Sequence, residues 1–226
     1  MKTKIKNLSY YNKVWITSDT HFNHRFMIDK EIRPLDYNEQ IIANINKMVG
    51  QDDLLIHLGD VIFDRQWELR PIIELLPWTK LLVRGNHDGQ GINWYKTHGF
   101  HDVCDELIIT WQNDIKLLLT HKPEIRKWYI NMCWHLHQWK DNPHRISSTL
   151  VNSNTRVYSQ EHMHYKPIDI WDFAADIYNE YTPITSSVFT RIYDTIKYWF
   201  IKYKGRHINK DLVANPNNFT VIELII

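Results

Sequence analysis

The chain has 226 residues, a length that one hydrophobic core, or one core with an appendage, can accommodate. A hydrophobic content of 43% is ordinary for a globular protein, and no apolar run is long enough to cross a bilayer, which excludes a membrane-spanning segment. The formal net charge of +1 excludes an overall basic surface as a reason for binding nucleic acid.

The cysteines and the start of the chain bear on its location. Cys104 and Cys133 form no CxxC pair and are too few for a disulfide framework, which is typical of a reducing compartment. The basic start, residues 1–7, is not followed by an apolar stretch of signal-peptide length. We therefore expect a cytoplasmic protein.

Strands and helices are predicted to alternate in the first half of the chain. Four short apolar runs have the length and composition of buried strands, and they span residues 14–17, 54–58, 80–83 and 116–120. Residues 37–48 carry apolar side chains at helical spacing and predict an amphipathic helix that packs on the sheet. Residues 66–76 predict another helix, which Pro71 is expected to shorten. This alternation indicates an α/β fold.

The second half of the chain gives a less regular pattern. Residues 107–110 and 115–119 flank a polar turn and predict a hairpin, so the sheet is expected to be mixed. Residues 155–159 predict a further strand. The last helical patterns cover residues 169–181 and 186–202. We therefore divide the chain into a main domain, residues 1–168, and a C-terminal helical extension packed on it, residues 169–226.

Each predicted strand of the first half ends in polar side chains that can bind metal ions. In chain order, the residues that follow the four strands are Asp19 with His21, Asp60, Asn86 with His87 and Asp88, and His121. Because the loops beyond the carboxyl ends of strands in α/β sheets converge on one crevice, these side chains are expected to meet. A single histidine is more often an ordinary surface or core residue, but repeated placement at strand ends favours one site.

These residue types suit a particular chemistry. Oxygen and imidazole ligands, with one carboxylate to bridge two cations, are what a binuclear centre for phosphoryl transfer requires. Such a pair of ions can generate hydroxide near neutral pH and bind the phosphoryl oxygens. The absence of cysteine from the candidate set argues against structural zinc. We expect two divalent ions, with Mn favoured and Fe or Zn as alternatives.

Five blocks in chain order carry a resemblance to a known family. They are Asp19-Thr20-His21, Gly59-Asp60, Gly85-Asn86-His87-Asp88, His121 and His135-Leu136-His137. The blocks resemble the DxH, GD, GNHD, H and GHxH motifs of the calcineurin-like metallophosphoesterases, and residues 165–167 look like the ending of small bacterial and phage members. The resemblance implies a four-layer αββα sandwich with mixed sheets and a metal-dependent phosphoric ester hydrolase.

The resemblance also implies a role for each matching residue. One metal ion would be held by Asp19, His21 and His137, and the other by Asn86, His121 and His135, while Asp60 would bridge the two. His87 would lie beside the substrate phosphate and stabilise the transition state or protonate the leaving oxygen, with Asp88 orienting its imidazole. Asn23 and His24 follow the first block closely enough to be candidates for lining the substrate pocket.

One position departs from the family pattern, because Trp134 stands where the family usually has glycine before His135. A glycine usually marks tight backbone or positive φ, so a tryptophan must adopt another conformation or lean into the pocket. In the pocket the ring would shape the substrate site, for example by stacking on a base, whereas the alternative is an ordinary packing residue. The substitution bears mainly on His135, on His137 and on turnover.

Three functions follow from these patterns. The first is hydrolysis of a phosphodiester or phosphomonoester of a nucleotide or other small molecule by metal-activated water. The second is a nuclease of the same family, which would hold a strand on the basic cluster of residues 197–210. The third is a catalytically degenerate scaffold for a protein partner, and Trp134 is its only support.

Overall fold

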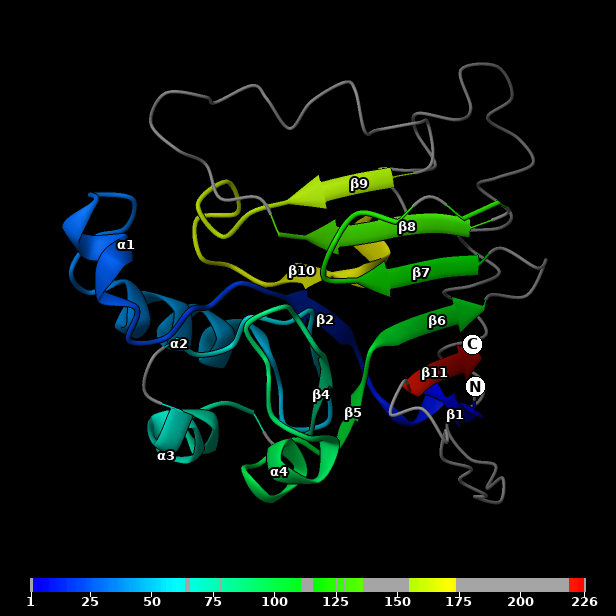
Figure 1. Ribbon diagram of the computed structural model, residues 1–226. Helices are drawn as coiled ribbons and strands as arrows, with labels where there is room; N and C mark the ends of the chain where they lie inside the picture. Colours follow the sequence, from blue (N-terminus) through cyan, green and yellow to red (C-terminus); the bar gives the residue numbers. More distant parts are fainter. Residues whose placement is uncertain are drawn as a thin grey trace, which may run out of the picture.

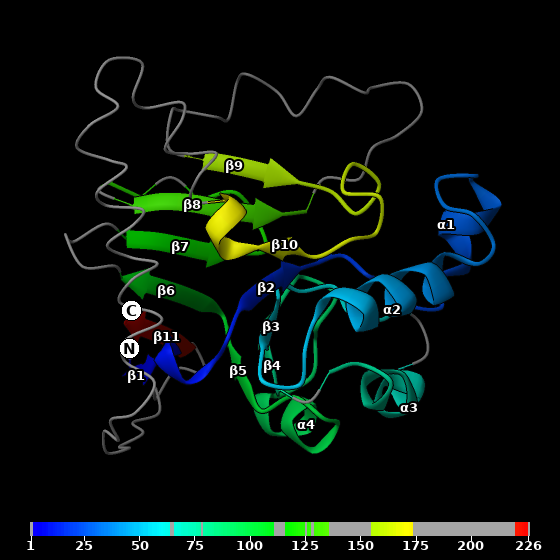
Figure 2. The ribbon, with the colours of Figure 1, turned by 180° about the vertical axis from the view of Figure 1, so that it is seen from behind.

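Two β-sheets stacked face to face form the body of the protein. The computed structural model describes residues 2–63, 66–77, 79–110, 116–124, 126–127, 129–135, 155–173 and 220–225. One sheet has six strands and the other five (Figure 1), and Figure 2 shows the helices lying against the five-stranded sheet. The predicted α/β class is confirmed.

The five-stranded sheet has the strand order β10-β2-β3-β4-β5. Its strands are β2 (Val14–Thr17), β3 (Leu54–His57), β4 (Thr79–Val83), β5 (Asp102–Cys104) and β10 (Ile168–Asp169). Neighbouring strands are parallel, except that β10 is antiparallel to β2. Every residue of β2 and β3 is buried, which explains why these strands appear in the sequence as continuous apolar runs.

The six-stranded sheet has the order β1-β11-β6-β7-β8-β9. Its strands are β1 (Lys2–Asn7), β6 (Glu106–Thr110), β7 (Lys116–Thr120), β8 (Tyr129–Trp134), β9 (Thr155–Tyr158) and β11 (Thr220–Ile225). All neighbours are parallel except β6 and β7, which pair antiparallel as the predicted hairpin requires. Both sheets are therefore mixed, as predicted.

Helices cover the outer face of the five-stranded sheet. They are α2 (Tyr37–Met48), α3 (Leu69–Glu74) and α4 (Ile92–Thr97), whereas α1 (Arg25–Asp29) lies away from the sheet, beyond the end of α2 (Figure 2). Two short 3-10 turns are η1 (Leu8–Tyr10) and η2 (Gln66–Glu68). Ile41 and Ile45 of α2 are fully buried in one cluster with Leu55 of β3 and Leu82 of β4. The predicted helix at residues 37–48 is confirmed, and the one at 66–76 divides into η2 and α3.

The C-terminal extension is described only in part. Residues 174–219 lie outside the described residues, so the helix predicted at 186–202 and most of the one at 169–181 lie outside them as well. The described end of the extension is strand β11, which lies between β1 and β6. The domain boundary at residue 168 stays a prediction. Among the described residues, no helix combines the length and apolar character needed to cross a membrane.

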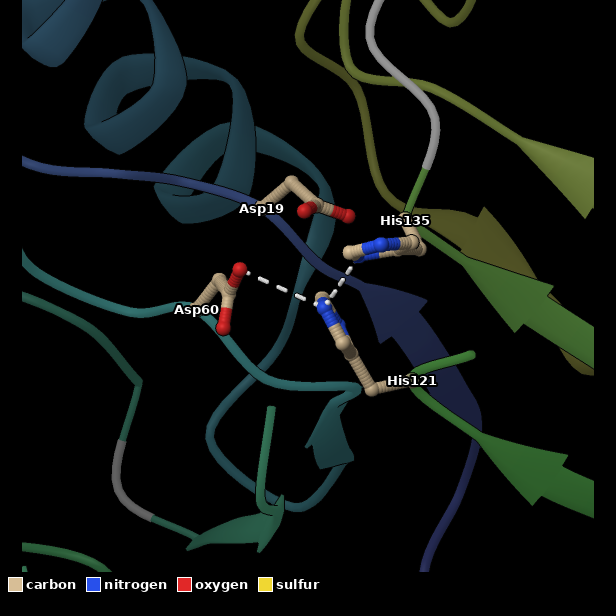
Figure 3. A group of neighbouring side chains, drawn as sticks. All are labelled: Asp19, Asp60, His121 and His135. Atoms are coloured by element: carbon tan, nitrogen blue, oxygen red, sulfur yellow. Dashed lines mark hydrogen bonds and ion pairs between the residues drawn. The ribbon is translucent and has the colours of Figure 1, made fainter. Parts of the chain in front are cut away.

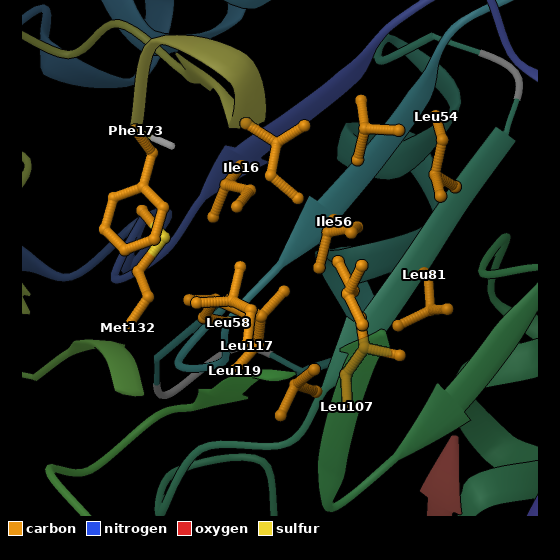
Figure 4. Packing of buried hydrophobic residues seen from close by; sticks show 14 of the residues in the cluster. Ile16, Leu54, Ile56, Leu58, Leu81, Leu107, Leu117, Leu119, Met132 and Phe173 are labelled. Atoms are coloured by element: carbon orange, nitrogen blue, oxygen red, sulfur yellow. The ribbon is translucent and has the colours of Figure 1, made fainter. Parts of the chain in front are cut away.

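The main core fills the space between the two sheets. Ile16, Ile56 and Leu81 of the five-stranded sheet pack against Leu107 and Leu117 of the six-stranded sheet (Figure 4), and all five are buried. Because side chains alternate between the two faces of a strand, the intervening residues of the five-stranded sheet point toward the helices. The core thus fixes the two sheets against each other and sets the relative position of their carboxyl ends.

Trp134, the last residue of β8, lies in this same core. Its side chain is fully buried, shares its face of β8 with Met132, and lies 5.5 Å between ring centroids from Tyr158. Its φ is not positive, and its N–H donates to the His121 carbonyl at 3.0 Å, so the backbone does not require a glycine here. Strand alternation directs the ring into the core, which is the packing alternative of the two that the sequence left open.

Replacing Trp134 should therefore affect stability. We expect Trp134→Ala to lower the free energy of unfolding by about 3–5 kcal/mol, since it leaves a large cavity in the core. Trp67 is 73% exposed, and Trp67→Ala is the matched control, with an expected change within about 0.5 kcal/mol. Denaturant unfolding measures both. Equal losses in the two variants would contradict this placement of Trp134.

Candidate metal centre

The predicted ligands come from the carboxyl ends of strands in both sheets. Asp19 and His21 follow β2, Asp60 follows β3 and Asn86 follows β4, whereas His121 and His135 follow directly after β7 and β8. The structure brings these residues together at the edge where the two sheets meet. His137 lies outside the described residues.

Four of these side chains form the centre of the group. One ligand atom from each of Asp19, Asp60, His121 and His135 lies within 4.8 Å of the others (Figure 3). His121 Nε2 is 3.2 Å from Asp60 Oδ2 and 2.8 Å from His135 Nδ1. The first three residues are buried and His135 is partly exposed, so the group opens to solvent on the His135 side.

The hydrogen bonds of His121 determine which of its nitrogens faces the centre. Its Nδ1 lies 2.8 Å from the carbonyl oxygen of Leu58, which can only accept, so Nδ1 carries the proton and donates it. Nε2 is then left with a lone pair, and it points at Asp60, at His135 and at Asn86 Oδ1, 3.1 Å away. Several lone-pair atoms therefore converge on one point.

Asp60 lies between two groups of candidate ligands. Its Oδ2 is 3.6 Å from His21 Nε2 and 3.2 Å from His121 Nε2. On one side, His21 Nε2 also lies 3.6 Å from Asp19 Oδ1, and on the other, His121 contacts Asn86 and His135. This arrangement is the one that a bridging carboxylate requires.

The two carboxylates differ in their ionisation. Burial and the neighbouring charge of Asp60 raise the pKa of Asp19 well above its ordinary value, and Arg33 opposes this only in part. Burial also raises the pKa of Asp60, but the hydrogen bond and positive charge of the His121 ring in its protonated form, together with the His87 N–H, outweigh burial and hold that pKa below its usual range. Two adjacent buried carboxylates are unfavourable unless a positive charge compensates them. A divalent cation fits this donor set of oxygen and imidazole nitrogen.

The backbone that carries the carboxylates is in a rare conformation. Asp19, His21 and Asp60 have φ values of 46°, 43° and 55°, in the left-handed region that costs a non-glycine residue roughly 1–2 kcal/mol. Hydrogen bonds between the loops hold them there, because the N–H groups of Asp19, His21 and Phe22 donate to the carbonyls of Gly59, Asp60 and Val61 at 2.9–3.0 Å. Strain that the surrounding structure maintains in this way is typical of functional sites.

Two glycines allow the loops after β3 and β4 to touch. A Cβ on Gly85 would lie 2.2 Å from Asp60 Oδ1 and 2.6 Å from the Asp60 nitrogen. A Cβ on Gly59 would lie 2.3 Å from the Gly85 nitrogen, and Gly59 has a φ of 94°. Glycine is therefore required at both positions, and the contact brings Asn86 beside Asp60.

His87 and Asp88 occupy different environments. The His87 N–H donates to Asp60 Oδ1 at 2.9 Å, and its imidazole, 42% exposed, has Nε2 3.9 Å from Asp60 Oδ2. Asp88 is buried, and its carboxylate accepts the N–H groups of Asp60 and Gly85 at 2.7 Å and of Val61 at 3.3 Å. The Asp88 oxygens thus join the loops after β3 and β4, and its predicted role in orienting His87 stays a prediction.

Asn23 and His24 lie at the edge of the group. The Asn23 side chain donates to Glu68 and accepts from Asn38 Nδ2 at 2.8 Å, so it joins the first loop to α2 and η2. The His24 ring stacks on Phe63 with 3.8 Å between centroids, and Phe63 also makes an edge contact with His87 at 4.7 Å. A contact of Asn23 or His24 with a bound substrate stays a prediction.

Residues 12–204, most of the chain, match the sequence model of the calcineurin-like phosphoesterase family. The chain belongs to this family. The recognition of the family from its sequence blocks is thereby confirmed.

Other known proteins are similar to this chain to different degrees. An uncharacterized protein from Methanocaldococcus jannaschii is 28% identical over 167 residues, which are 70% of this chain and 87% of that protein. The crystal structure of a protein of unknown function from Aquifex aeolicus has a TM-score of 0.57 and 24% identity, over 72% of this chain and 98% of that one, which shows a shared fold. A Pseudomonas putida nuclease has a TM-score of 0.39 and 19% identity over 55% of this chain and 61% of that one, a likeness too distant to establish a shared fold or function.

In this chain, the loops of the site are also supported by residues that the sequence did not reveal. His57 is buried, and burial lowers its pKa to about 3, so its ring is neutral. Its Nδ1 accepts the Gly59 N–H at 3.2 Å, so Nε2 carries the proton and donates to Thr20 Oγ1 at 3.0 Å. Thr20 in turn donates to the Val61 carbonyl at 2.7 Å. No motif marks this histidine, because its role depends on a contact between two loops.

The glycine contact gives a direct test of the geometry. We expect Gly85→Ala to lower the free energy of unfolding by about 1–3 kcal/mol, because its Cβ cannot be accommodated without moving the backbone of Asp60. A Cβ on Gly89 would meet no atom within 4 Å, so Gly89→Ala, in the same loop, is the control and should change stability by less than about 0.5 kcal/mol. Denaturant unfolding measures both variants, and equal losses of unfolding free energy would contradict this arrangement of the loops.

Proposed function

We propose that this chain hydrolyses a phosphodiester or phosphomonoester of a nucleotide or another small molecule, using two divalent metal ions. The observation that carries the proposal is the convergence of lone-pair atoms from Asp60, Asn86, His121 and His135 on one point beside Asp19. Membership of the calcineurin-like phosphoesterase family supports the choice of phosphoesters as substrates. The proposed ligands are Asp19, His21, Asp60, Asn86, His121, His135 and His137.

The distances favour a particular division of these ligands between the two ions. His121 contacts both Asn86 and His135, and these three residues would hold one ion. Asp19 and His21, with 3.6 Å between Asp19 Oδ1 and His21 Nε2, would hold the second ion with His137. Asp60 would bridge the two, since its Oδ2 faces both His21 and His121. The hydrogen bond from His121 Nδ1 to Leu58 fixes the imidazole so that Nε2 is presented to the ion.

The donor set is compatible with more than one metal. Carboxylate, amide and imidazole ligands suit Mn, which we favour, and also Fe or Zn. When bound, a pair of such cations supplies Lewis acidity, which lowers the pKa of a water molecule and offsets the charge of phosphoryl oxygens. Burial of Asp19, Asp60 and His121 limits access of bulk water to this part of the site.

His87 is the proposed catalytic residue outside the ligand set. Its backbone is held by Asp60, whereas its imidazole is the more exposed part and lies on the solvent side of that carboxylate. From there it can donate a hydrogen bond to a phosphoryl oxygen or a proton to the leaving oxygen. We propose that Asn23 and His24 contact the substrate at the same edge, and that Asp88 acts through the loops it joins.

The alternatives differ in their support. The basic cluster that a nuclease would use, residues 197–210, lies outside the described residues. The scaffold alternative depended on Trp134, and the burial of that ring in the core removes its support. A cytoplasmic location belongs to the same proposal and rests on the two cysteines, which are buried and free.

Replacing the bridging carboxylate tests the proposal. We expect Asp60→Asn to reduce turnover of an aryl phosphodiester by more than about 100-fold, because it removes the charge shared by both ions. Asp52 is exposed, and Asp52→Asn should keep wild-type activity. Chelator-treated wild type should be inactive, and Mn²⁺ should restore it. Release of the aryl alcohol measures the rate, with an aryl monoester and an oligonucleotide as further substrates.

Three results would count against the proposal. Near-normal activity of Asp60→Asn would remove the bridging assignment. Failure of every divalent ion to restore turnover on any of the substrates would favour a non-catalytic protein. Preference for the oligonucleotide, with a steep loss of binding as salt increases, would favour the nuclease.

A further inference from the structure

The loop that carries Asp19 and His21 is held by side chains from behind. Four consecutive carbonyl oxygens, those of residues 18–21, each accept a hydrogen bond from a side chain. Gln160 Nε2 donates to the first at 2.5 Å, Arg33 Nη2 and Nη1 donate to the next two at 2.8 and 2.7 Å, and the Tyr37 hydroxyl donates to the fourth. Because the N–H groups of Asp19 and His21 are also bonded, to the loop after β3, this backbone is fixed on both sides.

Arg33 contributes two of these four bonds, and it is fully withdrawn from solvent. The exposed fraction of its side chain is 0%, and its Nε lies 2.8 Å from Glu161 Oε1. Its guanidinium also lies over the Tyr37 ring, 5.2 Å from the centroid. A buried charge is unfavourable unless it is well paired, and a buried ion pair is weak support for a role in stability alone. The guanidinium fork instead matches two adjacent carbonyls in a geometry that lysine cannot reproduce.

The contacts of Arg33 concern one half of the site. The two backbone carbonyls that it binds, those of Asp19 and Thr20, belong to the loop with left-handed φ at Asp19 and His21. The half of the site that contains His121 is held differently, because the His121 ring is fixed by a hydrogen bond to the Leu58 carbonyl, next to the end of β3. A change at Arg33 should therefore reach the two halves unequally.

We propose that Arg33, paired with Glu161, is a positioning residue that sets the affinity for the metal ion on the Asp19–His21 side of the centre. The inference rests on the proposed two-ion function. By holding the carbonyls of Asp19 and Thr20, Arg33 keeps the Asp19 carboxylate and the His21 imidazole directed at the same point. Partners of this kind, which orient ligands without touching the ion, typically change metal affinity 10–100-fold when they are replaced.

Calorimetric titration with Mn²⁺ tests the inference without depending on activity. We expect wild type to bind two ions, and Arg33→Lys to bind one of them about 10- to 100-fold more weakly with the other changed by less than about threefold. Glu161→Gln keeps the shape of the partner and should weaken the same ion by a smaller factor. Arg70 is 64% exposed and pairs with Glu74, so Arg70→Lys is the matched control and should titrate like wild type.

A second titration locates the weakened ion. In a His135→Ala background, in which the ion beside Asn86 and His121 is weakened, adding Arg33→Lys should weaken the remaining ion by the same 10- to 100-fold factor. Thermal unfolding of each metal-free variant reports whether the fold is kept. If Arg33→Lys does not fold, Glu161→Gln alone decides the matter.

The outcomes separate this inference from the proposal on which it rests. A wild type that binds a single ion would overturn the two-ion proposal, and this inference with it. Two ions of unchanged affinity in Arg33→Lys and in Glu161→Gln would overturn the inference alone. Equal weakening of both ions would also overturn it, because it would indicate a general loss of structure instead of selective positioning.

Discussion

The contact between the backbones of the loops after β2, β3 and β4 is the constraint on which the rest of the site depends. The loop after β2 is bonded through its N–H groups to Gly59, Asp60 and Val61. The loops after β3 and β4 approach so closely that Gly59 and Gly85 leave no room for a side chain. Asp88 then accepts N–H groups from both of these loops. The position of each candidate ligand is therefore a property of the whole assembly of loops, and the two sheets supply the rigid base that such a site requires.

The buried carboxylates of the centre destabilise the protein when no cation is bound. Asp19 and Asp60 are both buried and adjacent, and the pKa of Asp19 rises because its charge is unfavourable there. His57, whose pKa falls to about 3, is neutral and supplies no positive charge to compensate them. Bringing these carboxylates together thus lowers the stability of the fold, and the hydrophobic contacts between the two sheets offset this loss. Sites that bind cations are commonly organised in this way.

Much of the first half of the fold could be predicted from local patterns. The strands β2 and β7 and helix α2 have the predicted limits, because each is a buried apolar run or an amphipathic period. Strand β8 was not predicted, since it contains Asn131, whose buried amide is satisfied by Leu118 and Thr120 of the neighbouring strand. The pairing of β1 with β11 was not predicted either, because it joins segments from opposite ends of the sequence.

The candidate site likewise has parts that local patterns predict and parts that depend on contacts between distant segments. Asp19, His21, Asp60, Asn86 and His121 were candidates because each follows a predicted strand, whereas His135 and His137 were candidates from the motif alone. The contacts of Asp88, His57 and Arg33 join separate loops, and no local pattern records them. The motif left the direction of the Trp134 ring open, and strand alternation decides it.

The place of β11 in the six-stranded sheet has a consequence for biosynthesis. β11 pairs with β6 on one side and β1 on the other, yet it is the last strand in the sequence. As the ribosome makes the chain from the N-terminus, the edge of β6 and the whole of β1 must wait without their neighbour until residues 220–225 have emerged. An unpaired strand edge is a template for pairing with another chain. The nascent protein is therefore exposed to misassembly until β11 has emerged, which comes after the loops of the candidate metal centre have been synthesised.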